Sequence, residues 1–215
     1  MARGYVGVMD SDQWDLRYAA TDLVWSAGPN RWVEEVAADL PPGRALDLAA
    51  GEGRNALWLA ERGWSVIAVD FSAVALERAR SLAGQRLGEQ AGRVELVKAD
   101  VRDYVPEPGA FDLVVIAYLQ VAQDVRRQVM RSAAGAVAAG GLLLVVAHDS
   151  DNLAHGTGGP QDPAVLYRAN DVAADVDGAG LRVVRARARA RPVEGAARDA
   201  IDAFFVAVRD AAPPA

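Results

Sequence analysis

The sequence predicts an α/β fold: a Rossmann-like, seven-stranded, mostly parallel sheet with helices on both faces and an antiparallel last strand. The first observation is that short apolar stretches alternate with helical stretches from about residue 30 onward, which is typical of a parallel sheet wrapped by helices. The second is that the chain closes with "LRVVRARARA" and "AIDAFFVAVRD". These alternating strands are too close together for a helical crossover, so they must pair antiparallel.

The first half of the chain supplies a clear strand, helix and strand unit. "PNRWVEEVAADLPPG" reads as a helix with Asn30 as its N-cap and Pro-Pro-Gly after its end. "RALDLAA" follows as a strand, "GRNALWLAERG" as a helix that closes with Gly63, and "WSVIAVD" as a strand. Ser72 then caps "AVALERARSLAGQRL", where apolar residues recur at helical spacing.

The second half continues the alternation. "RVELVKAD" and "FDLVVIAYL" read as strands, and "DVRRQVMRSAAGAVAAGG" as a helix that ends in a glycine pair. The near-continuous apolar run "LLLVVAHD" suits a buried central strand. After a Gly- and Pro-rich loop, "AVLYRANDVAADVDGAG" reads as a helix. We therefore expect an N-terminal arm over residues 1–29 and a single domain over residues 30–215.

Composition narrows the class of protein. A chain of 215 residues suits one large domain. The net charge of −6 gives no footprint for nucleic acid or an anionic membrane, and the absence of cysteine excludes disulfides and cysteine-based metal sites. The N-terminus lacks the apolar core of a signal peptide, and "LLLVVA" is too short to span a bilayer. We expect a cytoplasmic protein, monomeric or homodimeric, with no nucleic-acid or membrane partner.

A glycine loop between the first strand and the next helix indicates an adenosine cofactor. The segment "GEGRNA" satisfies the dinucleotide pattern G-x-G-x-x-G/A. Gly51 and Gly53 let the backbone turn sharply and approach a ligand closely. Asp70 ends the second strand about twenty residues later, where a carboxylate can accept both ribose hydroxyls. These features fit NAD and S-adenosylmethionine equally well.

Two further acids favour the second cofactor. Asp47 lies inside the first strand, where it would repel a pyrophosphate but suits an ammonium or sulfonium group. Asp100 ends the third strand and can accept from an adenine amino group, with Val101 offering its N–H and an apolar wall. The alternatives are a surface acid at a strand end for Asp47 and a helix N-cap for Asp100. The carboxyl ends of the strands form one edge of the sheet, where ligands bind in open α/β folds.

These motifs, read together as "ALDLAAGEGRNALWLA…VIAVDFS…VELVKADV…FDLVVIAYL", resemble the class I S-adenosylmethionine-dependent methyltransferases. The form "GEGRNALWLA" is most similar to the branch of tellurite-resistance and thiopurine-type enzymes. The resemblance implies that the cofactor is S-adenosylmethionine, with S-adenosylhomocysteine as product. It also implies a set of cofactor-binding residues: Asp47, Ala49, Gly51, Gly53, Asn55, Asp70, Phe71, Asp100, Val101 and Ala117. Ala49 replaces the first glycine of the family loop.

The N-terminal arm extends the resemblance. Thiopurine-type enzymes carry a W-x-x-x-aromatic pattern before the core, and Trp14 and Tyr18 match that spacing, with Trp25 following. Aromatic rings can cover a sulfonium through cation–π attraction. We therefore expect these three residues to form part of a lid over the cofactor. The alternative is an amphipathic helix that buries its aromatic residues against the sheet.

The chemistry itself requires mainly alignment of a nucleophile with the methyl group, and a base only where the nucleophile must lose a proton. The candidates near the fourth and fifth strand ends are Tyr118, His148, Asp149 and His155, of which Tyr118 and His148 are preferred. The chain lacks the N-P-P-Y turn and the metal-binding Asp of other methyltransferase types, so we expect a metal-independent enzyme that acts on an O, N, S or metalloid nucleophile of a small molecule. The alternatives are an NAD-linked oxidoreductase and a non-catalytic adenosyl-binding protein.

Overall fold

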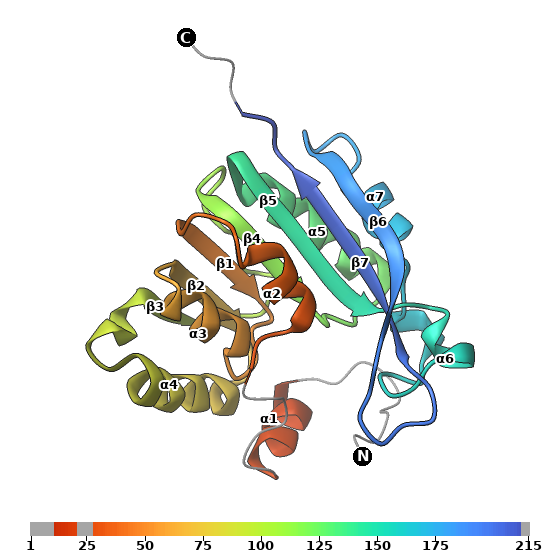
Figure 1. Cartoon of the computed structure of the whole chain (residues 1–215), viewed down its shortest axis with the longest axis horizontal. Coiled ribbons are helices and arrows are strands. Elements are labelled where there is room, and N and C mark those ends of the chain that lie inside the picture. The colour runs from red at the N-terminus through yellow and green to blue at the C-terminus, as the bar shows by residue number, and fades with distance from the viewer. Residues whose placement is uncertain (1–10, 21–27, 212–215) are drawn as a thin grey trace.

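The computed structural model describes residues 11–20 and 28–211. Its sheet has seven strands in the order β3-β2-β1-β4-β5-β7-β6 (Figure 1). Strand β7 runs antiparallel to both of its neighbours, and the other pairs are parallel. The predicted fold class, with its antiparallel last strand, is confirmed. The strands are β1 (Arg44–Leu48), β2 (Ser65–Asp70), β3 (Val94–Lys98), β4 (Phe111–Ala117), β5 (Val137–His148), β6 (Arg182–Arg191) and β7 (Ala200–Val208).

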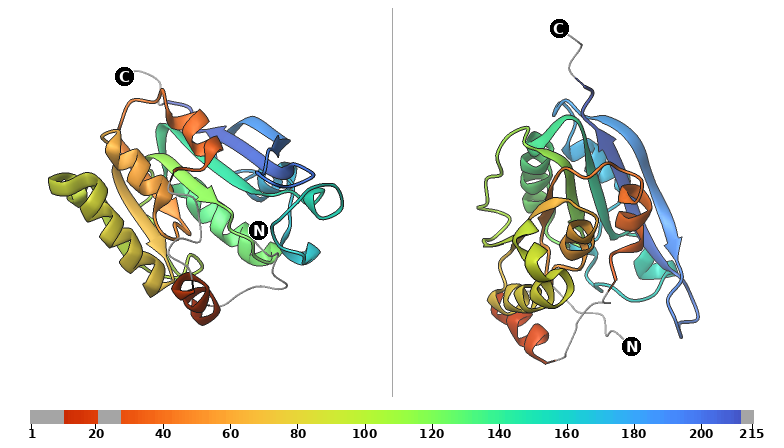
Figure 2. Two further views of the ribbon diagram at one scale, coloured as in Figure 1. Left: turned by 60° about the horizontal axis from the view of Figure 1, so that its bottom comes forward. Right: turned by 60° about the vertical axis from the view of Figure 1, so that its left-hand side comes forward.

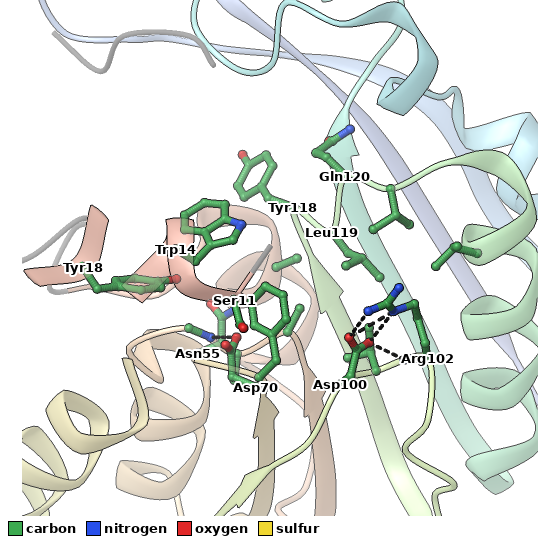
Figure 3. A pocket seen from close by; sticks show the side chains of 18 of the residues that line it. Ser11, Trp14, Tyr18, Asn55, Asp70, Asp100, Arg102, Tyr118, Leu119 and Gln120 are labelled. Carbon is green, nitrogen blue, oxygen red and sulfur yellow. Dashed lines mark hydrogen bonds and ion pairs between the residues drawn. The ribbon is translucent and has the colours of Figure 1, made fainter. Parts of the chain in front are cut away.

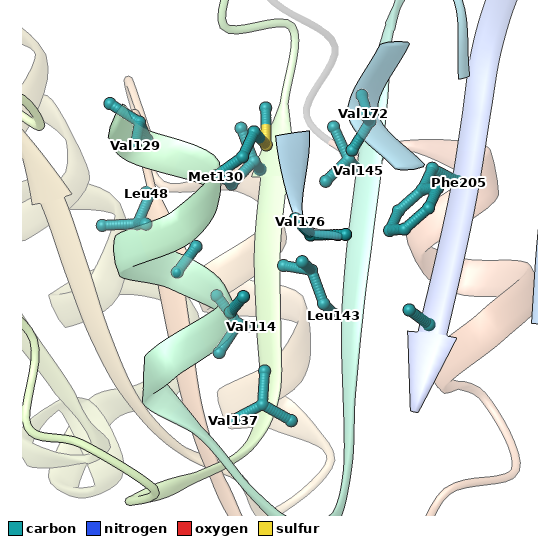
Figure 4. Packing of buried hydrophobic residues seen from close by; sticks show 14 of the residues in the cluster. Leu48, Val114, Val129, Met130, Val137, Leu143, Val145, Val172, Val176 and Phe205 are labelled. Atoms are coloured by element: carbon teal, nitrogen blue, oxygen red, sulfur yellow. The ribbon is translucent and has the colours of Figure 1, made fainter. Parts of the chain in front are cut away.

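Helices cover both faces of the sheet (Figure 2). On one face α2 and α3 bury Trp32 and Trp58 against the strands, and on the other α5 and α7 bury Met130 and Val172 (Figure 4). Phe204 and Phe205 of β7 pack into opposite cores, as successive residues of a strand should. The helices are α1 (Ser11–Ala19), α2 (Arg31–Ala37), α3 (Arg54–Glu61), α4 (Ala73–Leu87), α5 (Gln123–Ala136), α6 (Asn152–His155) and α7 (Ala169–Asp175), with 3₁₀ turns η1 (Gly88–Arg93) and η2 (Pro163–Val165).

Two predicted helix caps are present in the structure. The Asn30 side chain accepts a hydrogen bond from the Trp32 N–H at 2.8 Å and begins α2. Ser72 Oγ accepts from the Ala75 N–H at 3.0 Å and begins α4. Both side chains satisfy a backbone donor that the first helical turn leaves without an internal partner.

The end of α5 differs from the prediction. The helix stops at Ala136, and β5 begins at Val137, before the glycine pair. The pairing of β5 with β4 shifts register between Phe111 and Leu113. At Gly141 an added Cβ would lie 2.9 Å from the Phe111 carbonyl oxygen, so the glycine pair serves this irregularity in the sheet and does not end the helix.

The last predicted helix is also shorter than expected. Residues 163–165 form the 3₁₀ turn η2, and α7 starts only at Ala169, where Asp171 accepts from the Arg168 N–H at 2.8 Å.

In the described part of the chain, no helix combines the length and apolar character needed to cross a membrane.

Candidate active site

A cavity of about 390 Å³ opens at the carboxyl edge of the sheet (Figure 3). Its walls come from the segments that follow β1, β2, β3 and β4, and α1 closes one side. This volume lies within the usual range of small-molecule sites. Eleven sequence-predicted residues line it: Trp14, Tyr18, Ala49, Gly51, Asn55, Asp70, Phe71, Asp100, Val101, Ala117 and Tyr118.

Three predicted residues that the structure describes lie outside this lining, and a fourth is not described. Asp47, Gly53 and His148 are not among the described residues that line the cavity. Trp25 falls outside the described residues. Gly53 still shapes the site, since it precedes α3 with φ 77° and an added Cβ would lie 3.1 Å from Ala79 Cβ.

The loop between β1 and α3 adopts left-handed backbone at three positions. Ala49, Gly51 and Gly53 have φ values of 57°, 56° and 77°. Glycine adopts this region without strain, whereas a Cβ atom crowds the backbone there. Ala49 therefore occupies a conformation that suits the glycine for which it substitutes in the family pattern.

Replacing this residue should relieve the strain. Left-handed backbone costs an L-residue about 1–2 kcal/mol, and part of that gain is lost to the greater freedom of glycine in the unfolded chain. We expect Ala49→Gly to raise the free energy of unfolding by about 0.5–1 kcal/mol, measured by urea denaturation. A matched Ala50→Gly variant should not stabilise, because the φ of Ala50 is not positive. Equal effects at the two positions would contradict this account.

Asp70 ties the loop to the start of α4. Its Oδ2 accepts from the Gly51 N–H at 2.7 Å and its Oδ1 from the Ser72 N–H at 2.9 Å. Burial raises the pKa of this carboxyl group, and the backbone hydrogen bonds only partly offset the effect. A carboxylate has about four lone-pair sites, so Asp70, which lines the cavity, can accept further hydrogen bonds from a ligand there.

Asp47 is a buried acid beneath the same loop. Only 1% of its surface is exposed, and neither carboxylate oxygen has a hydrogen-bond partner in the part of the chain that the structure describes. Burial raises its pKa to about 7, and the charge of Arg54 only partly opposes this. A carboxylate in such a place is stabilised by any cation that approaches it.

Asp100 is held by a neighbour that the sequence analysis did not identify. The Arg102 guanidinium contacts both carboxylate oxygens, at 2.6–3.0 Å, and the Arg102 N–H donates to Oδ1 at 2.9 Å. The hydrogen bonds from Arg102 hold the pKa of Asp100 below its usual value. Asp100 therefore stays ionised at the cavity wall, and Arg102 lines the cavity beside it.

Helix α1 brings two aromatic residues to the cavity. Asp15 accepts from the Ser72 hydroxyl and, at 3.4 Å, from the Val74 N–H, which attaches α1 to the start of α4. Trp14 and Tyr18 then line the cavity with their ring centroids 5.5 Å apart. Tyr18 is 4% exposed, so it contributes to packing as well as to the wall of the cavity.

Tyr118 and His148, the two candidate catalytic residues, stack on each other at the end of β4. Their ring centroids lie 4.8 Å apart, and Tyr118 is the member that lines the cavity. Burial and the nearby carboxylate of Asp202 raise the pKa of Tyr118, so its phenol stays protonated. Burial lowers the pKa of His148 to about 4, so its imidazole is neutral at pH 7.

A buried carboxylate on β7 connects these groups. Asp202 accepts from the Tyr118 hydroxyl at 3.1 Å, from Trp32 Nε1 at 2.8 Å and from Arg191 Nε at 2.7 Å. Sequence reasoning missed it, along with Arg191 and the cavity-lining Arg54. The available signal was an acid at an inward position of "AIDAFFVAV", an otherwise apolar strand.

Sequence comparison matches residues 45–141 to the family model described as a methyltransferase domain. A Bacillus subtilis (strain 168) protein named as a methyltransferase (YqeM) is 31% identical over 156 residues, covering 68% of this chain and 61% of that protein. Demethylmenaquinone methyltransferase of Clavibacter sepedonicus is 40% identical over 104 residues, covering 48% of this chain and 38% of that protein. The chain thus matches about three fifths or less of the length of these curated relatives.

Solved structures share the fold at low sequence identity. A protein of Methanosarcina mazei described as an S-adenosylmethionine-dependent methyltransferase has a TM-score of 0.66 at 14% identity, covering 83% of this chain and 98% of its own. Magnesium protoporphyrin IX methyltransferase of Synechocystis PCC 6803, with S-adenosylmethionine bound, has a TM-score of 0.63 at 16% identity, covering 95% and 86%. The [4+2]-cyclase SpnF has a TM-score of 0.66 at 16% identity, covering 99% and 89%. Residues 45–141 of this chain thus match a methyltransferase domain, two curated relatives are named as methyltransferases, and solved methyltransferase structures share the fold.

Proposed function

We propose that this protein transfers a methyl group from S-adenosylmethionine to an O, N, S or metalloid nucleophile of a small molecule. The observation that carries the proposal is the set of acids around one loop. Asp70 and Asp100 line the cavity, and Asp47 lies buried beneath the loop with no hydrogen-bond partner among the described residues. Asp70 suits the ribose of NAD and of S-adenosylmethionine alike, whereas a carboxylate at Asp47 opposes a pyrophosphate and suits a cationic cofactor, which disfavours an NAD-linked oxidoreductase.

The adenosine half of the cofactor fits the acids at the ends of β2 and β3. We propose that Asp70, with Phe71 beside it, accepts from the ribose hydroxyls, and that Asp100 and Val101 flank adenine. All four residues line the cavity. The position of the Asp70 carboxylate at the cavity wall, held by the backbone of Gly51 and Ser72, supports this role.

The methionine half fits the loop after β1. We propose that the backbone from Ala49 to Gly53, with Asn55, holds this part, that Asp47 compensates the ammonium charge, and that Ala117 lies near the sulfonium. The left-handed turns of the loop and the unpartnered carboxylate of Asp47 support the assignment. The aromatic rings of Trp14 and Tyr18 support a covering role for the N-terminal arm, as in the tellurite-resistance and thiopurine-type branch.

The residues around the acceptor position then mainly orient the methyl acceptor and exclude water. Proton transfer is the smaller part of their role. S-adenosylmethionine, when bound, supplies an activated methyl group, and alignment of the nucleophile with it accounts for much of the rate. Tyr118 remains a neutral phenol and offers a fixed wall. His148 is neutral but lies behind Tyr118, so a base role requires rearrangement of that pair.

The proposal also covers the acceptor, the metal requirement and the assembly state. A small-molecule acceptor agrees with the net charge of −6 and with neighbours named for magnesium protoporphyrin IX and for glycopeptide N-methylation. We further propose that the transfer is metal-independent, on the sequence observation that the chain lacks the metal-binding Asp of catechol-type methyltransferases. A cytoplasmic monomer or homodimer without nucleic-acid or membrane partners completes the proposal.

Ligand binding tests the function directly. S-adenosylhomocysteine at one hundred times its dissociation constant should add about 2.7 kcal/mol of stability and raise the melting temperature, while NADH should not. Trp14→Ala should weaken the binding of S-adenosylhomocysteine in calorimetry if α1 covers the cofactor. Stabilisation by NADH alone would refute the proposal.

Turnover must be tested separately from binding. The fold also occurs in a protein named as a [4+2]-cyclase, and a non-catalytic adenosyl-binding protein would bind the same ligand. Release of S-adenosylhomocysteine from S-adenosylmethionine in the presence of a panel of small nucleophiles distinguishes these cases. Binding without any methylated product would favour the non-catalytic alternative.

A further inference from the structure

A buried polar cluster lies next to the cavity, on the side away from Asp70 and Asp100. At its centre is Asp202, which is 0% exposed. Besides the contacts to Trp32, Tyr118 and Arg191 Nε described above, it accepts from Arg191 Nη2 at 3.3 Å, and His148 Nδ1 lies 3.9 Å from Oδ1. We call these five residues the Asp202 cluster.

The elements that meet in this cluster are distant in the sequence. Trp32 belongs to α2, Tyr118 follows β4, and His148 ends β5 directly opposite Asp202 on β7. A fully buried carboxylate is costly unless several donors compensate its charge. The cluster therefore fixes the relative positions of side chains from opposite ends of the chain.

Tyr118 links the cluster to the cavity. It lines the cavity, and its backbone has φ 62°, a conformation that costs a non-glycine residue about 1–3 kcal/mol and persists where surrounding contacts impose it. Its N–H donates to the Val146 carbonyl at 2.7 Å and its hydroxyl donates to Asp202. Both ends of Tyr118 are thus held, and its ring forms a fixed wall.

Two guanidinium groups lie beside this wall. Arg191 Cζ is 5.6 Å and Arg54 Cζ is 5.9 Å from the centroid of the Tyr118 ring, and Arg54 lines the cavity. Arg191 is not among the described residues that line the cavity. It donates to Asp202 through Nε and Nη2, and its side chain is 24% exposed, so part of the guanidinium beside Tyr118 is accessible. A planar guanidinium suits a carboxylate partner.

The surface beside Arg191 has the same sign of charge. Strand β6 carries Arg185, Arg187, Arg189 and Arg191 at two-residue spacing, so they share one face of the strand. Glu35 pairs with Arg185 and Arg189. Two acids, Glu35 and Asp202, thus face four arginines in a protein whose net charge is −6. This row favours the approach of an anion toward Tyr118.

We propose that the methyl acceptor is a small molecule that carries a carboxylate, that this carboxylate binds Arg191 beside Tyr118, and that Asp202 is the positioning residue of this acceptor subsite. The inference rests on the proposed function and adds the substrate class. Asp202 itself does not touch the acceptor. Asp202 holds the Arg191 guanidinium and the Tyr118 ring in fixed orientations. In these orientations the carboxylate of the acceptor can bind with the nucleophile next to the transferred methyl group.

The test uses benzoate as the anionic probe and benzamide as its neutral match. Both are titrated into protein saturated with S-adenosylhomocysteine, with binding followed by calorimetry or NMR. We expect benzoate to bind at least tenfold more tightly than benzamide. We expect Arg191→Gln to weaken benzoate binding at least tenfold, while Arg182→Gln changes it less than twofold. Arg182 is a control on the same strand that pairs with Asp210 and lies outside both the arginine row and the cluster.

Asp202→Asn distinguishes positioning from general structure. We expect it to weaken benzoate binding at least tenfold and to leave the affinity for S-adenosylhomocysteine within twofold, because the cluster lies on the acceptor side. A parallel loss of both ligands would overturn the positioning role. If this variant does not fold, Arg191→Gln carries the test, since its charge is partly exposed.

Failure of this inference differs from failure of the proposed function. Wild-type protein that binds S-adenosylhomocysteine but binds benzoate no better than benzamide overturns the carboxylate assignment and leaves the methyltransferase proposal intact. An unchanged benzoate affinity in Arg191→Gln also overturns it. Absence of S-adenosylhomocysteine binding by the wild-type protein contradicts the proposed function, and the acceptor subsite falls with it.

Discussion

The free energy of unfolding of the ligand-free protein should fall by about 3 kcal/mol between pH 4 and pH 7 through Asp47 alone. Its pKa rises from 3.8 to about 7 in the folded protein because the carboxyl group is buried. The folded state therefore binds the proton more tightly than the unfolded state. The contribution of this group is fully present below pH 3.8 and is lost as the pH rises to about 7, at about 1.36 kcal/mol per pKa unit.

The matched variant is Asp47→Asn, which cannot ionise. Urea unfolding of both proteins from pH 4 to pH 8 should give nearly equal stability at pH 4 and a more stable variant at pH 7. Other acids with raised pKa values, such as Asp70 and Asp149, are common to both proteins and cancel in the difference. Parallel profiles would show that Asp47 has no raised pKa.

The same group should couple the proposed cofactor to pH. A cationic ligand near Asp47 favours the ionised carboxylate, so wild-type protein should release a proton on binding below pH 7. Calorimetry with S-adenosylmethionine in buffers of different ionisation enthalpy measures that release. Asp47→Asn should release no proton from this position on binding. That result would connect the buried carboxyl group of Asp47 to cofactor binding.

Local patterns in the sequence were sufficient to predict the fold. The alternation of strands and helices, the close spacing of the last two strands, and the caps at Asn30 and Ser72 all act over a few residues. The end of α5 was not predictable in this way. The glycine pair after it resembles a helix stop, and only the close approach of Gly141 to the Phe111 carbonyl shows its place in the sheet.

The candidate site likewise has one part that short sequence motifs predict and another that depends on contacts between distant residues. The acids and glycines at the strand ends follow from short motifs, because the carboxyl edge of a parallel sheet gathers them regardless of distant contacts. The Asp202 cluster does not follow from any motif. The hydrogen bond between Trp32 and Asp202 joins residues 170 positions apart. The cluster forms only because β7 pairs with β5, which places Asp202 opposite His148.

Removing the carboxylate of Asp70 should have the largest effect on cofactor affinity. We expect Asp70→Ala to weaken the binding of S-adenosylhomocysteine at least a hundredfold in calorimetry. Two charge-assisted hydrogen bonds to ribose hydroxyls, each contributing about 1.5–3 kcal/mol, would be lost. Asp100→Asn is the matched control, because Arg102 already engages both oxygens of Asp100, and we expect it to weaken binding less than tenfold.

The effect of Asp70→Ala on stability should be smaller, because two consequences oppose each other. The N–H groups of Gly51 and Ser72 lose their acceptor, at about 1–3 kcal/mol for each donor left buried without a partner. Against this, the variant no longer buries a carboxyl group whose raised pKa shows that burial disfavours its charge. We expect a net loss of about 1–3 kcal/mol in urea unfolding, so the variant should remain folded. A folded variant with unchanged affinity would reduce Asp70 to a structural tie between the loop and α4. A hundredfold loss of affinity in a protein that still unfolds cooperatively would establish that the same carboxylate both shapes the loop and binds the ligand.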